Sequence, residues 1–219
     1  VNGINGNVDM NICYVDYSTI IGGGGSSGGG ADLTLSVYDQ NTHAQVTGSV
    51  EDILSRIVMN EVGDWQNTEV CKAQAVAAYS WILYQQQHGN AIPSVGLDPA
   101  TPNSTVRNAV RAVKGQAIYY NGSPANAAYG SASAAYTNTA YNMWGLNLPY
   151  LNTSATSPES EFRGRVKEID SSTMLSNVTK MVGAAKANGT PHSQWVTDPV
   201  FDSHGYLTSI KVCGVTVSG

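Results

Sequence analysis

Residues 50–84 constrain the fold more than any other part of the chain, because their apolar residues recur at helical spacing on both sides of a short turn. In the first half of this stretch the apolar residues are three and four apart, which predicts a helix with one buried stripe. The members of this stripe are Val50, Ile53, Leu54, Ile57 and Val58. Ser49 predicts the start of the helix and Gly63 predicts its end.

A second helix is expected directly after this turn. It begins at Asn67 or Thr68, which are both good capping residues, and it ends near His88. Its inner face is built largely of alanine, and such small side chains let another backbone come close. The sequence therefore predicts two closely packed helices at the centre of the fold.

Glu61 occupies the next position of the apolar stripe in the first helix. A carboxylate at a position expected to be buried is paired, protonated or functional, because burying an unpaired charge is costly. Apolar surroundings raise the pKa of a carboxyl group, which suits a general acid. The alternative is that Glu61 forms a salt bridge at the helix end. We interpret Glu61 as the candidate catalytic residue.

The rest of the chain predicts an α+β fold, a single domain with an antiparallel sheet and helices on one side. Strands are expected at residues 33–37, 117–120, 125–129, 193–201 and 206–217. The third and fourth of the helices are expected at residues 104–114 and 171–186. Asn121-Gly122 predicts a hairpin turn, and residues 42–47 are expected to form a connection without a strand.

The N-terminal part has a different composition. Residues 1–21 contain a strand-like alternation at 8–14, and residues 22–30 form a Gly/Ser-rich tether with a span of about 15–18 Å. The main domain is then expected at residues 31–219. We expect the N-terminal strand to fill an unpaired sheet edge, either in its own molecule or in another, and the second case would give self-association.

The composition favours a secreted protein that binds a neutral polar ligand. Charged residues make up 12% of the chain, the net charge is −5, and no basic run is present, so nucleic acid is not an expected partner. A surface of Asn, Ser, Thr, Gln and Tyr suits carbohydrate. No apolar run reaches the length of a membrane span. Because the chain begins at Val1, we expect a removed signal peptide or a fragment.

The three cysteines, Cys13, Cys71 and Cys213, do not have the spacing of a zinc site, so we expect no metal and no other cofactor. Cys71 lies in a helical pattern and is interpreted as a small buried residue. Cys13 and Cys213 lie in strand-like segments, and a disulfide between them is one expectation for a secreted composition.

Two separated blocks resemble the stage II sporulation protein D family and its relatives, the amidase enhancers of bacterial cell walls. The first block is NEV at 60–62 with CKAQAVAAYSW at 71–81, and the second is AAYGSASAAYTNTAYNMWGLNLPYL at 127–151. The resemblance implies a lytic transglycosylase that acts on peptidoglycan glycan strands, and Glu61 matches the catalytic glutamate of the family. It also implies a further strand after Gly219, so a C-terminal truncation is expected.

Candidate substrate-binding residues lie in both blocks. Hydroxyl groups and neutral rings donate and accept hydrogen bonds without charge, and they suit the hydroxyls and N-acetyl groups of a glycan. The candidates are Gln74, Tyr79, Ser131, Ser133, Tyr136 and Thr137. For the Ser-rich part of the second block, an ordinary polar loop is the alternative.

One carboxylate is sufficient for cleavage if the nucleophile belongs to the substrate. Glu61 would protonate the leaving glycosidic oxygen and then accept the proton of the muramic acid 6-hydroxyl as it attacks C1, which leaves a 1,6-anhydro end. Two other functions stay open, because Ala134, Ala135 and Tyr79 differ from the family pattern. One is a glycan-binding or amidase-enhancing module with a cell-wall amidase as partner, and the other is a structural subunit of an extracellular assembly.

Overall fold

The computed structural model of the chain describes residues 10–14, 34–63, 67–130, 136–153 and 166–218. The chain forms two compact units, which are Val8–Tyr129 and Gly130–Gly219 together with Val1–Asn7. Each unit is described below by itself. The expected tether at residues 22–30 lies outside the described residues.

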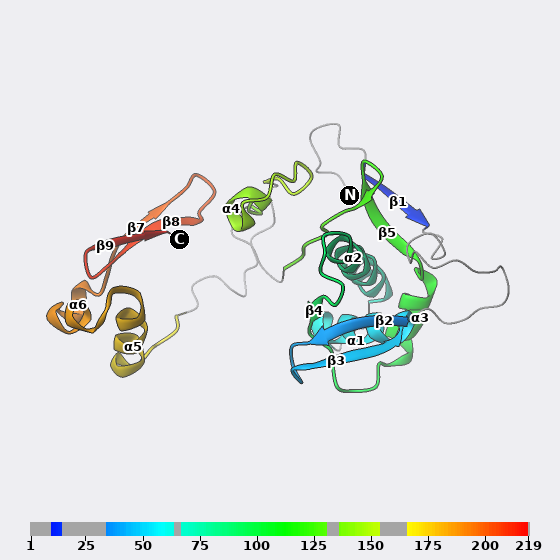
Figure 1. Cartoon of the computed structure of the whole chain (residues 1–219), viewed down its shortest axis with the longest axis horizontal. Helices are drawn as coiled ribbons and strands as arrows, with labels where there is room; N and C mark the ends of the chain where they lie inside the picture. The colour runs from blue at the N-terminus through cyan, green and yellow to red at the C-terminus, as the bar shows by residue number, and fades with distance from the viewer. Residues whose placement is uncertain (1–9, 15–33, 64–66, 131–135, 154–165, 219) are drawn as a thin grey trace. The chain divides into compact units, whose positions relative to one another are not determined.

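The first unit combines a helical layer with two small sheets (Figure 1). The bounds of its elements are β1 Met10–Tyr14, β2 Thr34–Asp39, β3 Ala44–Ser49, α1 Val50–Val62, α2 Thr68–Gln87, β4 Ser94–Val95, α3 Ser104–Ala112, β5 Gln116–Tyr120 and β6 Ser123–Pro124. The strand orders are β3-β2-β4 and β1-β5-β6.

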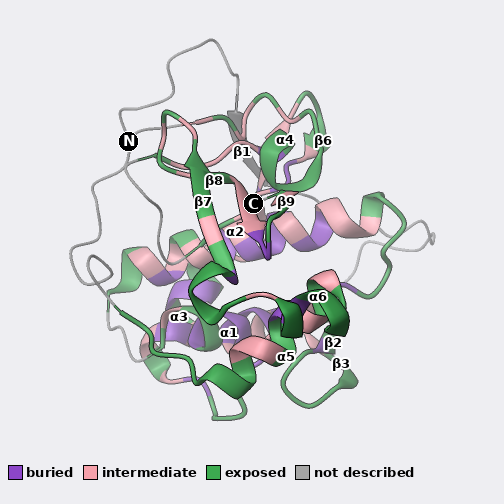
Figure 2. Ribbon diagram, turned by 90° about the vertical axis from the view of Figure 1, so that its left-hand side faces the viewer, coloured by how far each residue is buried: buried purple, intermediate pink, exposed green. Residues whose placement is uncertain are grey.

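Helix α1 begins and ends where its sequence predicts. The Ser49 side chain accepts a hydrogen bond of 3.1 Å from the backbone N–H of Asp52, so it satisfies one of the free donors of the first turn. Gly63 ends the helix with a φ of 62°, and its N–H bonds to the carbonyl oxygen of Met59. The predicted apolar stripe is buried throughout (Figure 2).

Helix α2 packs against α1 and the hairpin of β5 and β6. Asn67 caps its first turn, and Ala75 and Ala78 on its inner face are 1% exposed, as expected from their small size. The buried Ser80 hydroxyl accepts a hydrogen bond of 2.8 Å from the backbone N–H of Ile118 on β5. Cys71 is fully buried, which confirms its interpretation as a core residue. This helix is the central element of the core.

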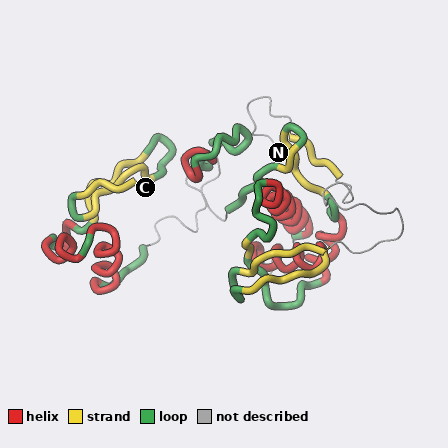
Figure 3. The backbone as a smooth tube through the Cα atoms, in the orientation of Figure 1, coloured by secondary structure: helices red, strands yellow, loops and turns green. Residues whose placement is uncertain are grey.

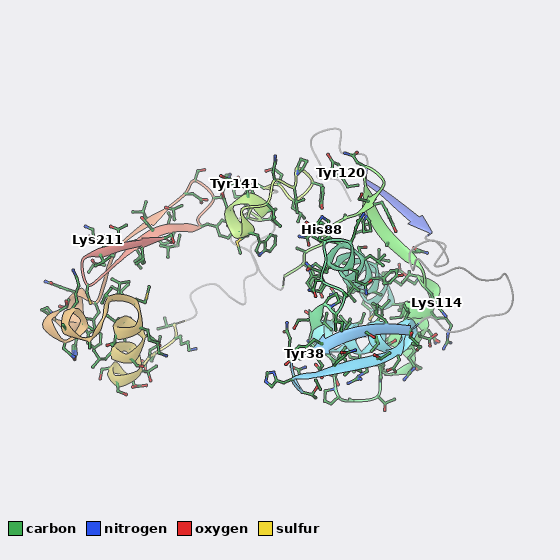
Figure 4. All side chains as sticks on the ribbon, viewed as in Figure 1. Tyr38, His88, Lys114, Tyr120, Tyr141 and Lys211 are labelled. Carbon is green, nitrogen blue, oxygen red and sulfur yellow. The ribbon has the colours of Figure 1, made fainter. Side chains whose placement is uncertain are left out.

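The sheet of β2, β3 and β4 lies beside α1 (Figures 1 and 3). Along β2 the side chains alternate between exposed and buried positions, with Tyr38 exposed (Figure 4) and Asp39 buried. Residues 44–49 form β3, although the sequence predicts a connection there. The prediction was wrong because β3 offers only one half-buried apolar residue, Val46, and its other side chains are polar or small. Hydrogen bonds with β2 determine its structure.

The N-terminal strand fills a sheet edge of its own chain. β1 pairs antiparallel with β5, with Met10 opposite Tyr120 and Tyr14 opposite Gln116. The hairpin of β5 and β6 forms across Asn121 and Gly122, both with positive φ, as the Asn-Gly turn predicts. β6 is shorter than expected, and its pairing ends at Pro124.

The second unit contains short helices and a three-stranded antiparallel sheet of order β7-β8-β9 (Figure 1). The bounds of its elements are α4 Ala140–Trp144, α5 Ser171–Val182, α6 Ala184–Gly189, η3 His192–Gln194, β7 Val196–Phe201, β8 Leu207–Val212 and β9 Val215–Ser218. Its core includes Trp195, whose indole N–H donates to the carbonyl oxygens of Ala187 and Thr190.

Two expectations for the second unit need correction. The single helix expected at 171–186 is divided at Gly183, whose φ of 85° is incompatible with a continuous α-helix. The strand expected at 206–217 is a hairpin, because Cys213 and Gly214 both have positive φ and turn the chain between β8 and β9. Cys213 is buried as a free thiol, and the side chain of Cys13 lies outside the described part of the chain.

The α+β fold class is confirmed by the mixture of helices with predominantly antiparallel sheets. The arrangement differs from the expected single sheet, since the described strands belong to three separate three-stranded sheets. The parallel pair of β2 and β4 makes one of them mixed. In the described part of the chain, no helix is long and apolar enough to cross a membrane.

Candidate active site

Glu61 lies in the last turn of α1 and is exposed. The expectation of a buried carboxyl group is therefore wrong. The buried stripe ends with Val58 and Met59, and the final turn before Gly63 extends beyond the core of the unit. The carboxyl group is therefore accessible to a ligand from solvent.

The Glu61 carboxylate lies beside a pair of asparagine side chains. Asn60 Nδ2 is 3.4 Å from Glu61 Oε1, and Asn60 Oδ1 accepts a hydrogen bond of 3.0 Å from Asn41 Nδ2. Asn41 Nδ2 also donates to the carbonyl oxygen of Leu97 at 3.1 Å. The three segments that meet here are the end of α1, the turn after β2 and the segment after β4.

The segment after β4 runs along one side of α1. The Arg56 guanidinium donates to the carbonyl oxygen of Asp98 at 3.0 Å, and the Asp98 N–H donates to the carbonyl oxygen of Arg56 at 3.1 Å. One helical turn later, Gly96 lies directly against Asn60. A Cβ atom on Gly96 would lie 2.4 Å from Asn60 Nδ2, so a side chain there would displace the Asn60 amide.

Tyr129 and Gln74 form the other neighbourhood of Glu61. Tyr129 is 42% exposed, and its partial burial raises the pKa of the hydroxyl to about 12, with a second contribution from the negative charge of Glu61. The side chain of Gln74 on α2 acts in the opposite direction, as a hydrogen-bonding neighbour of the Tyr129 hydroxyl. Gln74 Nε2 is buried, and it makes no hydrogen bond of good geometry with any described group, including the Tyr129 hydroxyl. Tyr129 is thus a protonated donor at physiological pH.

Asp39 at the end of β2 is a fully buried carboxylate below this site. Burial alone would raise the pKa of its carboxyl group, but hydrogen bonds and a nearby positive charge lower that pKa below its ordinary value. The groups responsible for the lowering are Thr42, Asn41, Leu97 and Arg56. Asp39 is therefore ionised at neutral pH, and its charge is compensated within the fold.

A comparison with known protein families gives a match over residues 38–120 to the stage II sporulation protein (SpoIID) family. The matched residues include Glu61 and all of its described neighbours except Tyr129. The second block of the resemblance, residues 127–151, lies outside this match.

A curated relative of this stage II sporulation protein segment is the amidase enhancer of Bacillus subtilis (strain 168). It is 32% identical over 102 residues, which cover 45% of this chain and 14% of the relative. The chain therefore spans a small part of the relative's length. The family and this relative support a role related to the bacterial cell wall.

Tyr79 is the candidate in the family segment whose position differs most from expectation. It is 3% exposed and belongs to the core cluster around α1 and α2, so its side chain is not available to a ligand. An aromatic residue on the inner face of a helix packs with the other core residues. Gln74, on the same helix, is the candidate whose side chain lies beside the Tyr129 hydroxyl, a group that is affected by the charge of Glu61.

The candidates of the Ser-rich block belong to the second unit. Tyr136 is exposed, its carbonyl oxygen accepts a hydrogen bond from the Tyr206 hydroxyl, and its ring lies edge-on to the ring of His204. Thr137 Oγ1 donates to the carbonyl oxygen of Asn152 at 3.3 Å. Ser131 and Ser133 lie outside the described residues. These candidates stay predictions.

No group of three or more His, Cys, Asp and Glu side chains suited to a metal ion is present in the ranges that the structure describes. The neighbours of Glu61 that the geometry identifies are amide and phenol groups, which bind polar ligands by hydrogen bonds. Such neighbours can hold sugar hydroxyl and N-acetyl groups beside a single carboxyl group.

Sequence reasoning did not identify Asn41, Asn60, Gly96 or Tyr129 as site residues. Asn60 precedes Glu61 in the NEV motif, and Tyr129 lies within the second block, so both belong to the blocks that resemble the family. Asn41 and Gly96 carry no local signal. Their place near Glu61 follows from the pairing of β2 with β4, which brings distant segments together.

Proposed function

We propose that the chain is a lytic transglycosylase of cell-wall glycan strands, with Glu61 as its general acid and base. It would act after secretion, at the cell surface or outside the cell. The observation that carries this proposal is the exposed carboxyl group of Glu61, which lies within the family segment, beside the neutral amide of Asn60. This arrangement supports proton transfer to a glycosidic oxygen.

The reaction requires one carboxyl group and no external nucleophile. Glu61 donates its proton to the glycosidic oxygen between muramic acid and glucosamine, and the bond from that oxygen to C1 of muramic acid breaks. The resulting Glu61 carboxylate then accepts the proton of the muramic acid 6-hydroxyl, while the 6-hydroxyl oxygen forms a bond to C1. The products are a glycan with a 1,6-anhydro end and a second glycan with a free hydroxyl.

Gln74 and Tyr129 have the chemistry to orient the sugar at this carboxyl group. Tyr129 stays protonated because the pKa of its hydroxyl is raised to about 12, so it donates a hydrogen bond at neutral pH. Gln74 acts through Tyr129, because its side chain lies beside the Tyr129 hydroxyl and can orient that donor toward a sugar or N-acetyl oxygen. Neither group carries a charge, which suits the hydroxyl and N-acetyl groups of a glycan.

The substitution Glu61→Gln tests the proposal. It preserves the size of the side chain and removes the acidic proton, so cleavage should fall by a factor of about 10² to 10⁴ while binding of glycan strands is retained. Mass spectrometry of glycan strands stripped of peptides would measure the anhydromuramic ends. Wild-type turnover in the Gln variant would show that another group is the acid.

A second function is favoured by the name of the relative, which is an amidase enhancer. In this case the same surface binds glycan or a cell-wall amidase and does not cleave. The two functions differ in one measurement. An enhancer raises the activity of a purified amidase and leaves no anhydromuramic ends when it is incubated with glycan alone.

A further inference from the structure

Glu61 is the exposed end of a chain of hydrogen bonds that starts at the buried carboxylate of Asp39. We propose that Asn60 is the positioning residue of Glu61, held in one orientation by Asn41 and by the close approach of Gly96. This inference rests on the proposed role of Glu61 as acid and base.

The orientation of the Asn60 amide follows from a carbonyl group. Leu97 O can only accept, so the Asn41 atom that lies 3.1 Å from it is the donor Nδ2. The same Nδ2 uses its second hydrogen toward Asn60, which must therefore present Oδ1 at 3.0 Å. The Asn60 Nδ2 group is then directed to Glu61 Oε1.

The base of this chain is fixed because Asp39 is fully buried and accepts several hydrogen bonds. Its Oδ1 accepts from the N–H of Asn41 at 3.1 Å and from the N–H of Leu97 at 3.0 Å. Its Oδ2 accepts from the Thr42 hydroxyl at 2.7 Å. The Asp39 carboxylate thus joins the backbone at Asn41 to the backbone at Leu97. The Asn41 side chain bridges the same two segments through its hydrogen bond to the Leu97 carbonyl oxygen.

Gly96 supplies the second, independent constraint on Asn60. A Cβ atom there would lie 2.4 Å from Asn60 Nδ2 and 2.9 Å from Asn60 Cγ, distances that no packed structure retains. The Asn60 amide therefore lies in the space that a side chain at position 96 would fill. Its position is limited by backbone on one side and by Asn41 on the other.

The consequence concerns which oxygen of Glu61 carries the catalytic proton. Glu61 Oε1 accepts a hydrogen bond from Asn60 Nδ2. Protonation of Oε1 is therefore less favourable than protonation of Oε2. Oε2 is left to hold the proton and to face the substrate. The hydrogen bonds from Asn41 to Asn60 and from Asn60 to Glu61 would therefore set both the rotamer of Glu61 and the site of protonation.

The first test needs no enzymatic activity. The side-chain NH₂ signals of Asn60, assigned by their loss in Asn60→Ala, would be followed by NMR from about pH 3 to about pH 7, where a Glu carboxyl titrates. We expect these signals to shift with pH in the wild type and to lose that shift in Glu61→Gln, in which Asp39 and Tyr129 are unchanged. If the Asn60 signals shift with pH equally in the wild type and in Glu61→Gln, the contact between Asn60 and Glu61 is wrong.

The second test separates positioning from stability. Asn60→Ala and Gly96→Ala should each lower kcat by a factor on the order of 10 to 100, with KM changed by less than about twofold, because a misplaced acid slows the chemical step. The matched controls are Asn103→Ala, which removes the cap of α3, and Gly48→Ala, where a Cβ meets only ordinary contacts. Both controls should keep wild-type kcat.

The results distinguish this inference from the proposed function. If the wild type makes anhydromuramic ends, Glu61→Gln does not, and Asn60→Ala and Gly96→Ala match the wild type, the positioning role is wrong and the acid stands. If the wild type makes no such ends, the proposed function is wrong, and the NMR titration alone then decides whether Asn60 holds Glu61.

Discussion

At the residue scale, Tyr129 offers a direct probe of the charge on Glu61. Burial and the Glu61 charge raise the pKa of Tyr129 to about 12, so replacing Glu61 with Gln should lower that pKa toward its ordinary value and leave the effect of burial. The measurement is an NMR titration of tyrosine labelled at the ring carbon that bears the hydroxyl, with Tyr129→Phe to assign the signal. Gln74→Ala should act in the opposite direction, because the Gln74 side chain lowers this pKa. A Tyr129 pKa that is equal in the wild type and Glu61→Gln would contradict the proximity of the two groups.

At the element scale, α1 and α2 could be predicted almost to the residue, because their caps and apolar spacing are local properties of the sequence. The surroundings of Glu61 could not, since they depend on where the turn after β2 and the segment after β4 meet α1. Asp39 joins these segments, and its lowered pKa predicts how the stability of the fold depends on pH. Unfolded chains bind the proton at higher pH than the fold does, so the stability due to Asp39 is present at neutral pH and is lost as pH falls through its lowered pKa. Asp39→Asn should lower the free energy of unfolding by about 1–3 kcal/mol at neutral pH, because the new NH₂ group would face the N–H and O–H donors that now bind the Asp39 carboxylate. The difference in melting temperature between Asp39→Asn and the wild type should be smaller in acid than at neutral pH. An equal difference at acidic and neutral pH would contradict this account.

At the scale of the whole molecule, the sequence indicated the fold class and a role for the N-terminal strand, but not the division into two units. That division depends on which contacts form between distant segments, and composition does not mark it near Tyr129. The pairing of β1 with β5 within one chain predicts the effect of deleting residues 1–21. The melting temperature should fall, because the edge of β5 loses its partner, whereas the mass measured by light scattering should correspond to the same oligomeric state. A smaller oligomer after the deletion would show that the strand joins separate molecules, and an unchanged melting temperature would remove the pairing as a source of stability.

Cleavage in ¹⁸O-labelled water tests most directly whether Glu61 acts alone with a nucleophile from the substrate. If the muramic acid 6-hydroxyl attacks C1, no solvent oxygen enters the product, and mass spectrometry will find unlabelled anhydromuramic ends whose formation is lost in Glu61→Gln. Reducing ends that carry ¹⁸O would mean that water is the nucleophile. In that case the protein would be a hydrolase that needs a second carboxylate, and the single-carboxylate mechanism would be wrong.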